Sequence, residues 1–504
     1  MAIQQFPDKP LPELLFASED DASGARRIQR LAREGRARRL YAGIYTSNLQ
    51  SPIETIVLRH WRSIVGHLLP GGVVSYRSAF DGSPKDDQFF VTRGRTRRTL
   101  TLPGLTVAVV PGAGPVHSTP AQTDSPLGDL FLASDPRRFL ENLRQGRGWP
   151  ARVLPQTELE ARLDRILMLG GERRLNQLRD DARSLASQLQ MEAEFQRLDG
   201  LIGALLGTQE SKRLTAAQAL ARAAGRPYDP NRLHLFDALF EKLHNTEFAD
   251  IPDPAARGTA REAFAFFESY FSNYIEGTTF TVEEAKDIVF HGRIAPNRSE
   301  DSHDVLGTFQ AALNSPWRDQ PAQSPEAFLD WLRKVHALVM QKRPDKNPGE
   351  WKDRANQAGN TLFVLPELVP GTLREGFERL RSLRHPLARA IMAMFVVAEV
   401  HPFIDGNGRT ARLAMNCELS AAGQCRILIP TVYREDYLLP LKALSLNADA
   451  EPIMRAMTRI QRWSGAFDYA LHFEELRFAL ERCHAFEEDL RNFKLVFPER
   501  IERS

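Results

Sequence analysis

Residues 401–412 read His-Pro-Phe-Ile-Asp-Gly-Asn-Gly-Arg-Thr-Ala-Arg. The apolar run 387–400 precedes this stretch, and residues 410–419 again have helical spacing of apolar side chains. We therefore expect a loop that joins two helices. Gly406 and Gly408 permit positive φ and a close approach of a ligand, so the N–H groups that open the second helix predict an anion site.

The side chains of this loop suit a polyphosphate. Arg409 and Arg412 are three residues apart, which places two permanent cations on one side of the first helical turn. Asp405 supplies the single carboxylate that Mg²⁺ commonly takes from a protein beside phosphate oxygens and water. His401 can accept a proton near neutral pH. A histidine at a helix end, a Gly-Asn-Gly turn and solvated arginines are each common, but their combination within twelve residues predicts nucleotide chemistry.

Two other phosphate-binding loops do not fit the sequence. The chain contains no Gly-Lys pair and therefore no Walker A loop. Residues 406–411 lack the third glycine of a dinucleotide-binding fingerprint, and they follow a predicted helix rather than a strand. The loop is thus neither a P-loop nor a Rossmann loop.

The stretch 401–412 matches without a gap the signature His-x-Phe-x-[Asp/Glu]-Gly-Asn-Gly-Arg-x-x-Arg, and so resembles Fic (filamentation induced by cAMP) proteins. The resemblance implies an all-helical core that transfers AMP from ATP to a Tyr, Ser or Thr hydroxyl of a target protein. It implies that His401 deprotonates the hydroxyl, that Asp405 holds Mg²⁺ and that Arg412 contacts the γ-phosphate. The positions implied to bind nucleotide phosphates are Gly406, Asn407, Gly408, Arg409 and Arg412. A Fic loop does not fix the donor by itself, so transfer of another phosphate-linked group stays open.

A second informative stretch, 272–277, ends a helical pattern that begins near Thr259. Thr259 and Glu262 have the spacing of a capping box. Ser272 and Glu276 are spaced i to i+4 and face the same way. Gly277 follows, where a glycine ends many helices.

This stretch resembles the Fic inhibitory motif, [Ser/Thr]-x-x-x-Glu-[Gly/Asn], in the subclass that carries an inhibitory helix, here residues 259–277, before the core. The resemblance implies that Ser272 and Glu276 form the inhibitory motif and that Glu276 pairs with Arg412, which denies Arg412 to the γ-phosphate. Each ~1.4 kcal/mol of bias toward such a closed state lowers activity tenfold. In some relatives the matching glutamate assists removal of AMP, and whether Glu276 does so is open.

The first 50 residues predict a short helix and a basic hairpin. Residues 26–39 contain seven arginines and one glutamate, Gly35 ends the helical pattern, and residues 40–45 have strand character. A charge run is usually a solvated face. The pattern nevertheless resembles the winged helix of AbiEi-type antitoxins, which implies binding to operator DNA. The candidate DNA contacts are Arg36, Arg38 and Arg39.

The AbiEi resemblance continues to about residue 160. Residues 89–92 read as a strand, residues 93–98 as a basic turn, and residues 99–107 as two strands around a Pro-Gly turn. We therefore expect a multidomain protein, with a winged helix and a small α/β region before an all-helical Fic core that carries a short β-hairpin flap. The expected segments are a winged helix at 1–50, the α/β region at 51–160, a helical connector at 161–250, the Fic core at 251–470 and a C-terminal helix at 471–504.

The flap that positions the target in Fic proteins is expected at residues 356–364. Its candidate residues are Thr361, Leu362 and Phe363. This segment departs from the commoner arginine-containing flap sequence, so the choice of target stays open. Further along, Tyr433 and Tyr437 have helical spacing, and we expect core packing for them, with a wall for adenine as the alternative.

The composition is that of a folded protein, with 42% hydrophobic residues and a formal net charge of +2 over 504 residues. This balance gives no global attraction to nucleic acid or membrane. Cys417, Cys425 and Cys483 have neither disulfide-framework nor zinc spacing, which predicts free thiols in a reducing compartment. The N-terminus does not resemble a signal peptide and no run reaches eighteen apolar residues. We expect a cytoplasmic protein with no membrane partner, and monomer and homodimer stay open.

The sequence therefore predicts an autoinhibited protein adenylyltransferase with a DNA-binding N-terminal region. An alternative from another class is an AbiEi-like transcriptional regulator or antitoxin whose Fic half senses nucleotide and catalyses little.

Overall fold

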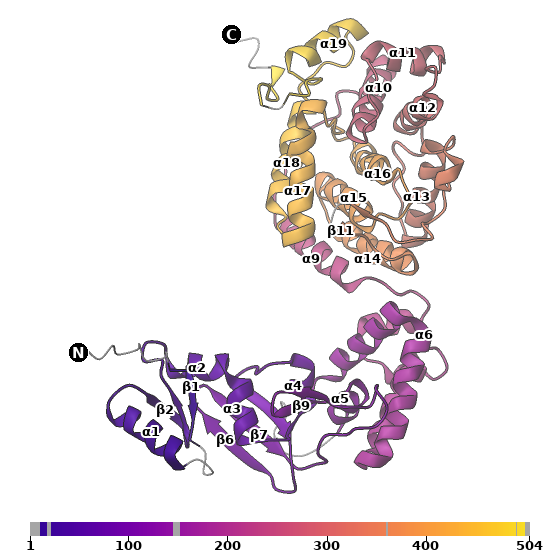
Figure 1. Cartoon of the computed structure of the whole chain (residues 1–504). Helices are drawn as coiled ribbons and strands as arrows, with labels where there is room; N and C mark the ends of the chain where they lie inside the picture. Colours follow the sequence, from indigo (N-terminus) through magenta and orange to yellow (C-terminus); the bar gives the residue numbers. More distant parts are fainter. Residues whose placement is uncertain (1–10, 18–21, 145–151, 359–360, 490, 499–504) are drawn as a thin grey trace, which may run out of the picture. The chain divides into compact units, whose positions relative to one another are not determined.

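The computed structural model describes residues 11–17, 22–144, 152–358, 361–489 and 491–498 (Figure 1). The chain divides into two compact units, Met1–Ala223 and Ala224–Ser504, which are described separately. No helix in the described part of the chain has both the length and the apolar character needed to cross a lipid bilayer.

The first unit begins with a small antiparallel sheet and one basic helix. Ile28 and Leu31 pack with Leu15 and Ala37 in a small core beneath this sheet. A helix followed by a two-stranded hairpin agrees with the predicted local structure, while its identity as a winged helix stays a prediction. The elements are β1 (Leu14–Phe16), α1 (Ala22–Arg33), β2 (Arg38–Tyr41) and β3 (Ile44–Thr46), in the sheet order β1-β3-β2.

A mixed six-stranded sheet forms the centre of the first unit, in the order β6-β7-β5-β4-β9-β8. Phe89 and Val91 of β5 face a core shared with Trp61, while Phe90 faces the opposite side with Tyr76. This alternation is the period of two expected for a strand covered on both faces. The elements are α2 (Ile53–Arg59), α3 (Trp61–Leu68), β4 (Val73–Val74), α4 (Tyr76–Asp81), β5 (Gln88–Thr92), β6 (Arg98–Leu102), β7 (Leu105–Val110), β8 (Ser125–Leu127) and β9 (Leu130–Leu132).

The predicted Pro-Gly turn between residues 99 and 107 is confirmed. Leu102 pairs with Leu105 across the turn, and Gly104 has φ +67°. A side chain is strained in that conformation, and a Cβ here would also press on Glu54. The predicted strand at 89–92 is confirmed as β5.

A fully buried cluster of charges lies where α5 (Asp135–Asn142) meets the loop before β8. Arg137 Nε donates to Glu141 Oε1 at 2.8 Å, and Arg137 Nη1 donates to Asp124 Oδ2 at 2.6 Å. Glu141 Oε2 also accepts the backbone N–H of Tyr76. Burial raises the pKa of Glu141, and the Arg137 guanidinium only partly offsets this. The cluster therefore ties α5 to α4 and to the sheet.

The helices that follow belong to the first unit rather than to a separate connector. α5 packs with α6 (Gln156–Leu189), α7 (Glu192–Leu205) and α8 (Ala217–Ala223) around Leu163, Leu185 and Leu198. Gly171 interrupts α6 with non-helical φ and ψ. The connector expected at 161–250 is thus divided: its first part shares this core, and its last part belongs to the second unit.

The second unit is a helical bundle around α15, which is apolar on nearly all sides and buried. α15 packs along α16 and α14, and the two predicted helices that flank the loop are confirmed. The longer elements are α9 (Pro230–His244), α10 (Gly258–Ile275), α11 (Val282–His291), α12 (Ser299–Leu313), α13 (Pro325–Val339), α14 (Val369–Ser382), α15 (Pro386–Val400), α16 (Asn407–Ala421), α17 (Arg434–Asn447), α18 (Glu451–Ser464) and α19 (Phe473–Arg482). The shorter ones are η2 (Ser211–Arg213) in the first unit and η3 (Pro344–Lys346), β10 (Gln357–Ala358), β11 (Thr361–Leu362), η4 (Pro366–Leu368) and η5 (Thr431–Tyr433) here.

α10 is present as predicted, but its start differs from the prediction. Its first helical residue is Gly258, so Thr259 already lies inside the helix and cannot act as the N-cap. The capping box predicted from Thr259 and Glu262 is therefore wrong. A complete capping box forms at the next helix instead, between Thr281 and Glu284 of α11.

We expect Arg137→Met to destabilise the first unit by about 3 to 5 kcal/mol, because it leaves two buried carboxylates without their cation. Urea unfolding, followed by hydrogen exchange in peptides of that unit, measures the change. Arg183→Met is the matched control, since this arginine makes an exposed ion pair with Asp180; a loss within about 0.5 kcal/mol is expected there. Equal losses for the two variants would contradict the importance of the buried cluster.

Candidate active site

The loop between α15 and α16 is fixed by its own side chains. Asn407 Oδ1 accepts the Phe403 N–H at 2.8 Å, and Asn407 Nδ2 donates to the Phe403 carbonyl at 3.0 Å. Gly406 caps α16 with φ +71°, as its sequence position suggested. The side chain of Asn407 is thus occupied within the loop. Asn407 can therefore contribute only its backbone N–H to the predicted anion hole. This N–H lies in the first turn of α16, with those of Gly408 and Arg409.

His401 caps the C-terminus of α15 in a left-handed conformation, with φ +53°. Its Nδ1 lies 3.2 Å from the carbonyl oxygen of Ala398, so Nδ1 carries the proton and Nε2 is left as the acceptor. The ring of Phe363 stacks on the imidazole with 3.8 Å between ring centres. Burial lowers the pKa of His401 to about 4. The imidazole is therefore neutral at pH 7, with Nε2 able to take a proton.

Asp405 places a partly exposed carboxylate beside the start of α16. Its Oδ1 accepts the Gly406 N–H at 2.6 Å and lies 3.8 Å from Arg409 Nη2. The side chain is 43% exposed. Among the described residues, no three His, Cys, Asp or Glu side chains come together as a metal-binding group. A metal ion here would depend on ligands from the nucleotide and from water, which is the usual situation for Mg²⁺.

His336 of α13 supports this loop, although no sequence motif pointed to it. Its Nδ1 accepts the Gly349 N–H at 2.9 Å, and its Nε2 donates to the Asp405 carbonyl at 3.1 Å. Its ring stacks on Phe403 at 3.7 Å between ring centres. Burial lowers the pKa of His336 to about 4. The bond from the Gly349 N–H requires a lone pair on Nδ1, so His336 can make both hydrogen bonds at once only when its ring is neutral.

The predicted flap segment 356–364 contains a short antiparallel hairpin, in which β10 pairs with β11. Thr361 and Leu362 form β11, Leu362 is 53% exposed, and Phe363 turns onto the His401 ring. Residues 359 and 360 lie outside the described residues.

Lys352 fastens the base of this hairpin to the loop and was also missed from the sequence. Its Nζ donates to Asn356 Oδ1 at 2.7 Å and to the Val400 carbonyl at 3.3 Å. Asn356 Nδ2 donates to the Phe403 carbonyl at 2.9 Å. Burial lowers the pKa of Lys352 to about 7. The residues on both sides of His401 are thus tied to the first residue of the flap.

A polar seam runs between α10 and α16. Glu268 and Ser272 of α10 and its C-cap, Glu276, are spaced four residues apart. They meet Arg412 and Asn416, which are four residues apart on α16. Asn416 Nδ2 donates to Glu268 Oε1 at 2.9 Å. Burial raises the pKa of Glu268 to about 7. Regular i, i+4 spacing on both helices lets these pairs form in register.

Arg412 is held by three hydrogen bonds from this seam. Its Nε donates to Ser272 Oγ at 2.9 Å, and its Nη2 donates to the Ser272 carbonyl at 2.9 Å and to Glu276 Oε1 at 2.7 Å. Its side chain is 5% exposed. The contact between Glu276 and Arg412 that the resemblance implied is therefore present, while its inhibitory role stays a proposal. Tyr437 is buried beside this guanidinium, consistent with the core role expected for it.

The Glu276 carboxylate also lies directly against Gly408. A Cβ at Gly408 would collide with Glu276 Oε1 and lie 3.1 Å from Arg412 Nη1. The lack of a side chain at Gly408 thus leaves space for the Glu276 carboxylate. Of the two glycines, Gly406 has positive φ and Gly408 does not. A carboxylate therefore rests at the N-terminal turn of α16, where a helix attracts negative charge.

Arg409, the second arginine of the loop, is bound to a carboxylate that the sequence did not reveal. Its Nη1 lies 2.5 Å from Asp304 Oδ2 of α12, and Arg343 Nε donates to the same oxygen at 2.8 Å. Burial raises the pKa of Asp304, and the two guanidiniums only partly offset this. Arg409 Nε is buried without a hydrogen-bond partner among the described residues. Arg409 is therefore tied to α12 by a buried ion pair.

Part of the chain matches a known protein family. Residues 327–419 match the model of the Fic/DOC family. The matched segment contains the loop, His336, Lys352 and the flap, and it ends within α16.

Curated relatives match over a longer part of the chain. Protein adenylyltransferase fic-1 of Caenorhabditis briggsae is 28% identical over 233 residues, 44% of this chain and 45% of that protein. Protein adenylyltransferase Fic of Drosophila erecta is 31% identical over 214 residues, 40% of this chain and 41% of that protein. The chain thus spans less than half the length of these relatives. A solved structure of part of Fic-1 from C. elegans has 20% identity and a TM-score of 0.36, and it covers 64% of this chain and 93% of that chain.

The neutral His336 predicts a loss of stability in acid. Between pH 6.5 and pH 4 the unfolded chain binds a proton at this residue and the folded chain does not, so the free energy of unfolding falls as the pH falls. At pH 5 the loss from His336 is about 2 kcal/mol relative to pH 7.5. Urea unfolding of the second unit at both pH values, in wild type and His336→Gln, measures it. The variant should lose less stability in acid; an identical pH dependence in the two proteins would contradict the assignment.

Proposed function

We propose that the chain is a Fic-type protein adenylyltransferase, which transfers AMP from ATP to a Tyr, Ser or Thr hydroxyl of a target protein, and that Glu276 holds it inactive. The observation that carries this proposal is the Glu276 carboxylate in contact with Arg412 and Gly408 at the start of α16. The family match over 327–419 and the curated adenylyltransferase relatives support it.

His401 serves as the general base in this reaction. Nδ1 is engaged by the Ala398 carbonyl, so Nε2 accepts the proton of the target hydroxyl. The hydroxyl oxygen forms a bond to the α-phosphorus, the bond between that phosphorus and the bridging oxygen breaks, and pyrophosphate leaves. Negative charge from a bound triphosphate would raise the pKa of the imidazole above its value of about 4 and strengthen it as a base.

The nucleotide phosphates fit the start of α16. The N–H groups of Asn407, Gly408 and Arg409 open the helix, where a helix favours negative charge. Arg412 would contact the γ-phosphate. The half-exposed carboxylate of Asp405 fits a single-carboxylate Mg²⁺ site, and the ion supplies charge neutralisation for the leaving pyrophosphate.

The flap positions the target. Leu362 is exposed on β11 and Phe363 covers the His401 ring, so a target chain lying along β11 would bring a hydroxyl toward Nε2. Arg232 of α9 donates to the Leu362 carbonyl and pairs with Glu399 of α15, which fixes the hairpin from the other side.

Inhibition follows from competition for one guanidinium. In the closed state Glu276 neutralises Arg412 and places negative charge where phosphate would approach. Ser272 holds the Arg412 side chain through its hydroxyl and its carbonyl. Removal of Glu276 would therefore free the charge of Arg412 without releasing its position.

We expect Glu276→Gly to raise Mg-ATP-dependent labelling of lysate proteins at least tenfold, because ~1.4 kcal/mol of bias toward the closed state suffices for that factor. Labelled ATP and mass spectrometry identify the modified proteins and side chains. Glu276→Gln, which keeps the size and removes the charge, should give an intermediate rise. His401→Ala combined with Glu276→Gly is the inactive control. No labelling by Glu276→Gly across several lysates would overturn the proposal.

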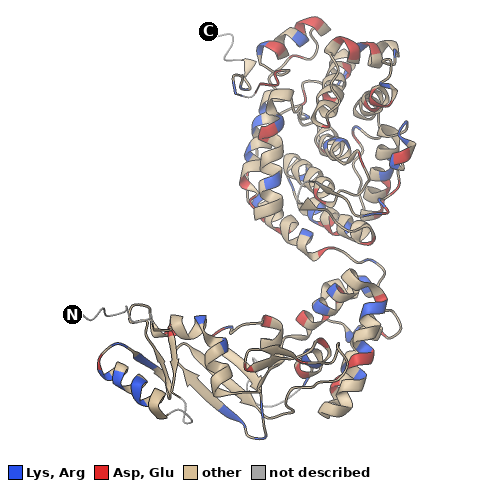
Figure 2. Ribbon diagram, viewed as in Figure 1, with Lys and Arg blue, Asp and Glu red and all other residues tan. Residues whose placement is uncertain are grey.

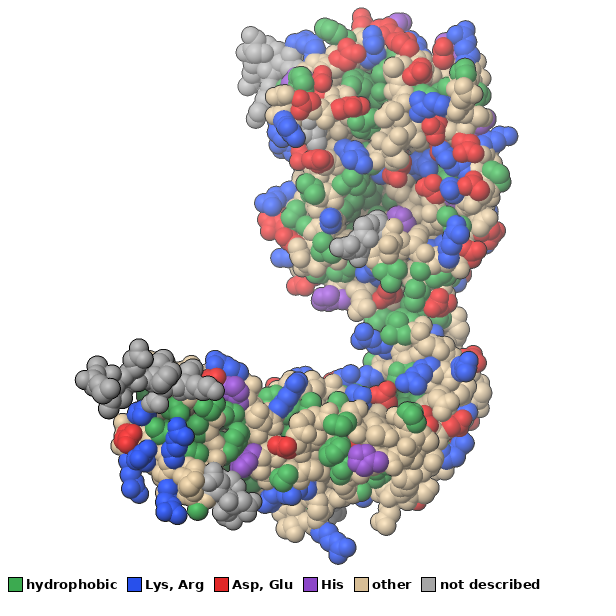
Figure 3. All heavy atoms as spheres, in the orientation of Figure 1, with side chains coloured by type: hydrophobic (Ala, Val, Ile, Leu, Met, Phe, Trp, Pro, Cys, Tyr) green, Lys and Arg blue, Asp and Glu red, His purple; other side chains and the backbone are tan. Residues whose placement is uncertain are grey.

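A second candidate function, binding to operator DNA, is favoured by the surface of the first unit. Arg26, Arg27, Arg30 and Arg33 of α1 are exposed, and so are Arg36 in the turn before β2 and Arg39 of β2. Figures 2 and 3 show Lys and Arg side chains gathered over this part of the first unit. Such a face can contact phosphates while a helix enters a groove.

Arg38 does not belong to this surface. Its guanidinium donates to the backbone carbonyls of Asn48 and Ser51, so it braces the sheet. The set of candidate DNA contacts in the hairpin is therefore Arg36 and Arg39.

We expect the double substitution Arg36→Ala and Arg39→Ala to weaken binding to DNA from the promoter of the protein's own gene. The slope of log K against log salt should fall by about 2, one for each lost phosphate contact. Gel shift at several salt concentrations measures it. Arg183→Ala, an exposed arginine elsewhere in the unit, should leave the slope unchanged. Binding that is the same in both variants would exclude the hairpin from the interface.

A further inference from the structure

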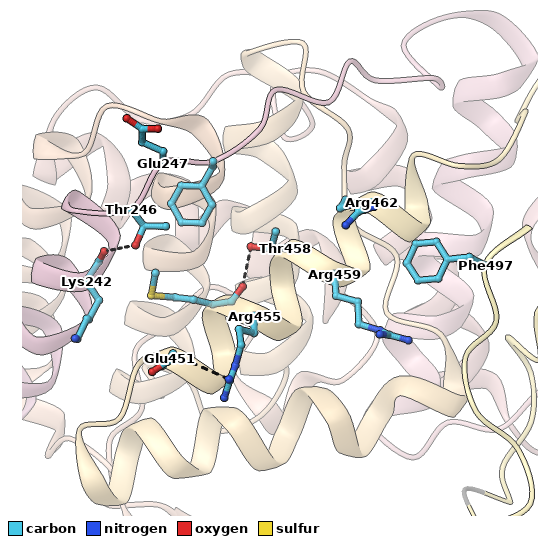
Figure 4. A pocket seen from close by; sticks show the side chains of 11 residues that line it. Lys242, Thr246, Glu247, Glu451, Arg455, Thr458, Arg459, Arg462 and Phe497 are labelled. Atoms are coloured by element: carbon cyan, nitrogen blue, oxygen red, sulfur yellow. Dashed lines mark hydrogen bonds and ion pairs between the residues drawn. The ribbon is translucent and has the colours of Figure 1, made fainter. Parts of the chain in front are cut away.

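A hollow of the helical unit lies apart from the loop, between the end of α9 and the face of α18 (Figure 4). Its volume is about 880 Å³, and the C-terminal segment closes one end through Phe497. We call this hollow the α9–α18 groove. Its lining residues are Lys242, Thr246, Glu247, Phe248, Glu451, Met454, Arg455, Thr458, Arg459, Arg462 and Phe497.

The α18 side of the groove is a stripe of arginines. Arg455, Arg459 and Arg462 are spaced i, i+4 and i+7, so they follow one face of the helix, and all three are exposed. A cation in the last turn, such as Arg462, complements the helix dipole, but this does not account for Arg455 and Arg459 in the middle of the helix. Arg455 has only a weak pair with Glu451, at 3.5 Å between groups that are 72% and 69% exposed.

The floor of the groove is apolar and partly aromatic. Phe248 is half-buried and lies against His385, with 5.4 Å between ring centres. Met454 is buried at the base of α18, and Phe497 lies under the Arg459 guanidinium at 5.5 Å. Figure 4 shows Arg459 and Arg462 beside Phe497 at one end of the groove, with Glu247 and Thr246 across from α18. The groove can thus accept an apolar side chain of a ligand between its own arginine side chains.

The mixture of arginines, apolar side chains and two glutamates in the groove favours a peptide over a polyphosphate chain as its ligand. Glu247 and Glu451 also line the groove, and they would repel the closely spaced charges of a nucleic-acid backbone. A peptide can avoid both, because it carries carboxylates only at chosen positions and places apolar side chains between them. Carboxylates four and seven residues apart on an amphipathic helix would match the arginine stripe.

The groove lies at the far end of α15 from the candidate base. Phe248 packs on His385, the N-cap of α15, whereas His401 is its C-cap. A helix of 15 residues is roughly 22 Å long. A protein held at the groove could therefore present a hydroxyl to His401 through a linking segment, which raises its effective concentration there.

We propose that the α9–α18 groove docks an acidic peptide segment that carries an aromatic or large aliphatic side chain, and that this segment belongs to the protein modified at His401. The second half of this statement rests on the proposed transferase function, whereas the docking does not.

The test is selection of random 12-residue peptides displayed on phage, on the full-length protein and on its Arg459→Glu/Arg462→Glu variant. The wild type should enrich peptides with two or more Asp or Glu and at least one aromatic or large aliphatic residue. Fluorescence anisotropy of the best selected peptide should show at least tenfold weaker binding to the variant. Arg293→Glu/Arg482→Glu, with the same change of net charge at exposed sites outside the groove, should bind like wild type.

Three outcomes would overturn the docking. They are the absence of acidic enrichment on the wild type, equal binding by the two charge-reversed variants, and tighter binding of a single-stranded DNA 12-mer than of the peptide at the same groove. None of these readouts depends on catalysis. If the docking holds and fusion of the selected peptide to a Tyr-containing reporter does not increase its labelling by the Glu276→Gly form, which labels other proteins, the link to modification is wrong.

Discussion

The carboxylate of Glu276 and the guanidinium of Arg412 meet at 2.7 Å beside the first turn of α16, and the proposed control of the helical unit depends on this contact. A phosphate group and a carboxylate compete for the same features there, a helix N-terminus and a buried arginine. Ser272 fixes the arginine from the same helix that carries Glu276. Because Gly408 has no side chain, the carboxylate can approach the helix closely. The last turn of α10 and its C-cap therefore supply both the groups that hold Arg412 in place and the carboxylate that pairs with it.

Around this contact the loop is held by the neutral Asn407 and His336, as well as by Lys352 and by the ion pair between Arg409 and Asp304. Asn407 closes the loop on Phe403, and the neutral His336 ring donates to the Asp405 carbonyl while it accepts the Gly349 N–H. His401 is neutral as well, since burial lowers its pKa to about 4. Within residues 401–412 the charged side chains are therefore Asp405, Arg409 and Arg412. In this structure the Glu276 carboxylate occupies the start of α16.

The sequence predicted the parts of this site that are local in the chain. Helices 387–400 and 410–419, the loop between them, the hairpin in 356–364 and the Ser272–Glu276 spacing all follow from periodicity or motif. Residues that act across the bundle were not found: His336, Asp304 and Lys352 lie in helices or loops with no distinctive pattern, and only packing brings them to the loop. Asn407 was predicted to contact phosphate and Arg38 to contact DNA, but both side chains form hydrogen bonds with backbone groups of the protein instead. The capping box was wrong because α10 begins one residue earlier than Thr259.

The most direct measurement of the central claim compares ATP and ADP binding, since only ATP has the γ-phosphate that would compete with Glu276 for Arg412. Isothermal titration with ADP and with a non-hydrolysable ATP analogue, on wild type and on the Glu276→Gly form, separates the two. We expect the substitution to raise the affinity for the triphosphate at least tenfold relative to ADP, about 1.4 kcal/mol. Equal changes for both nucleotides, or no change for either, would contradict it.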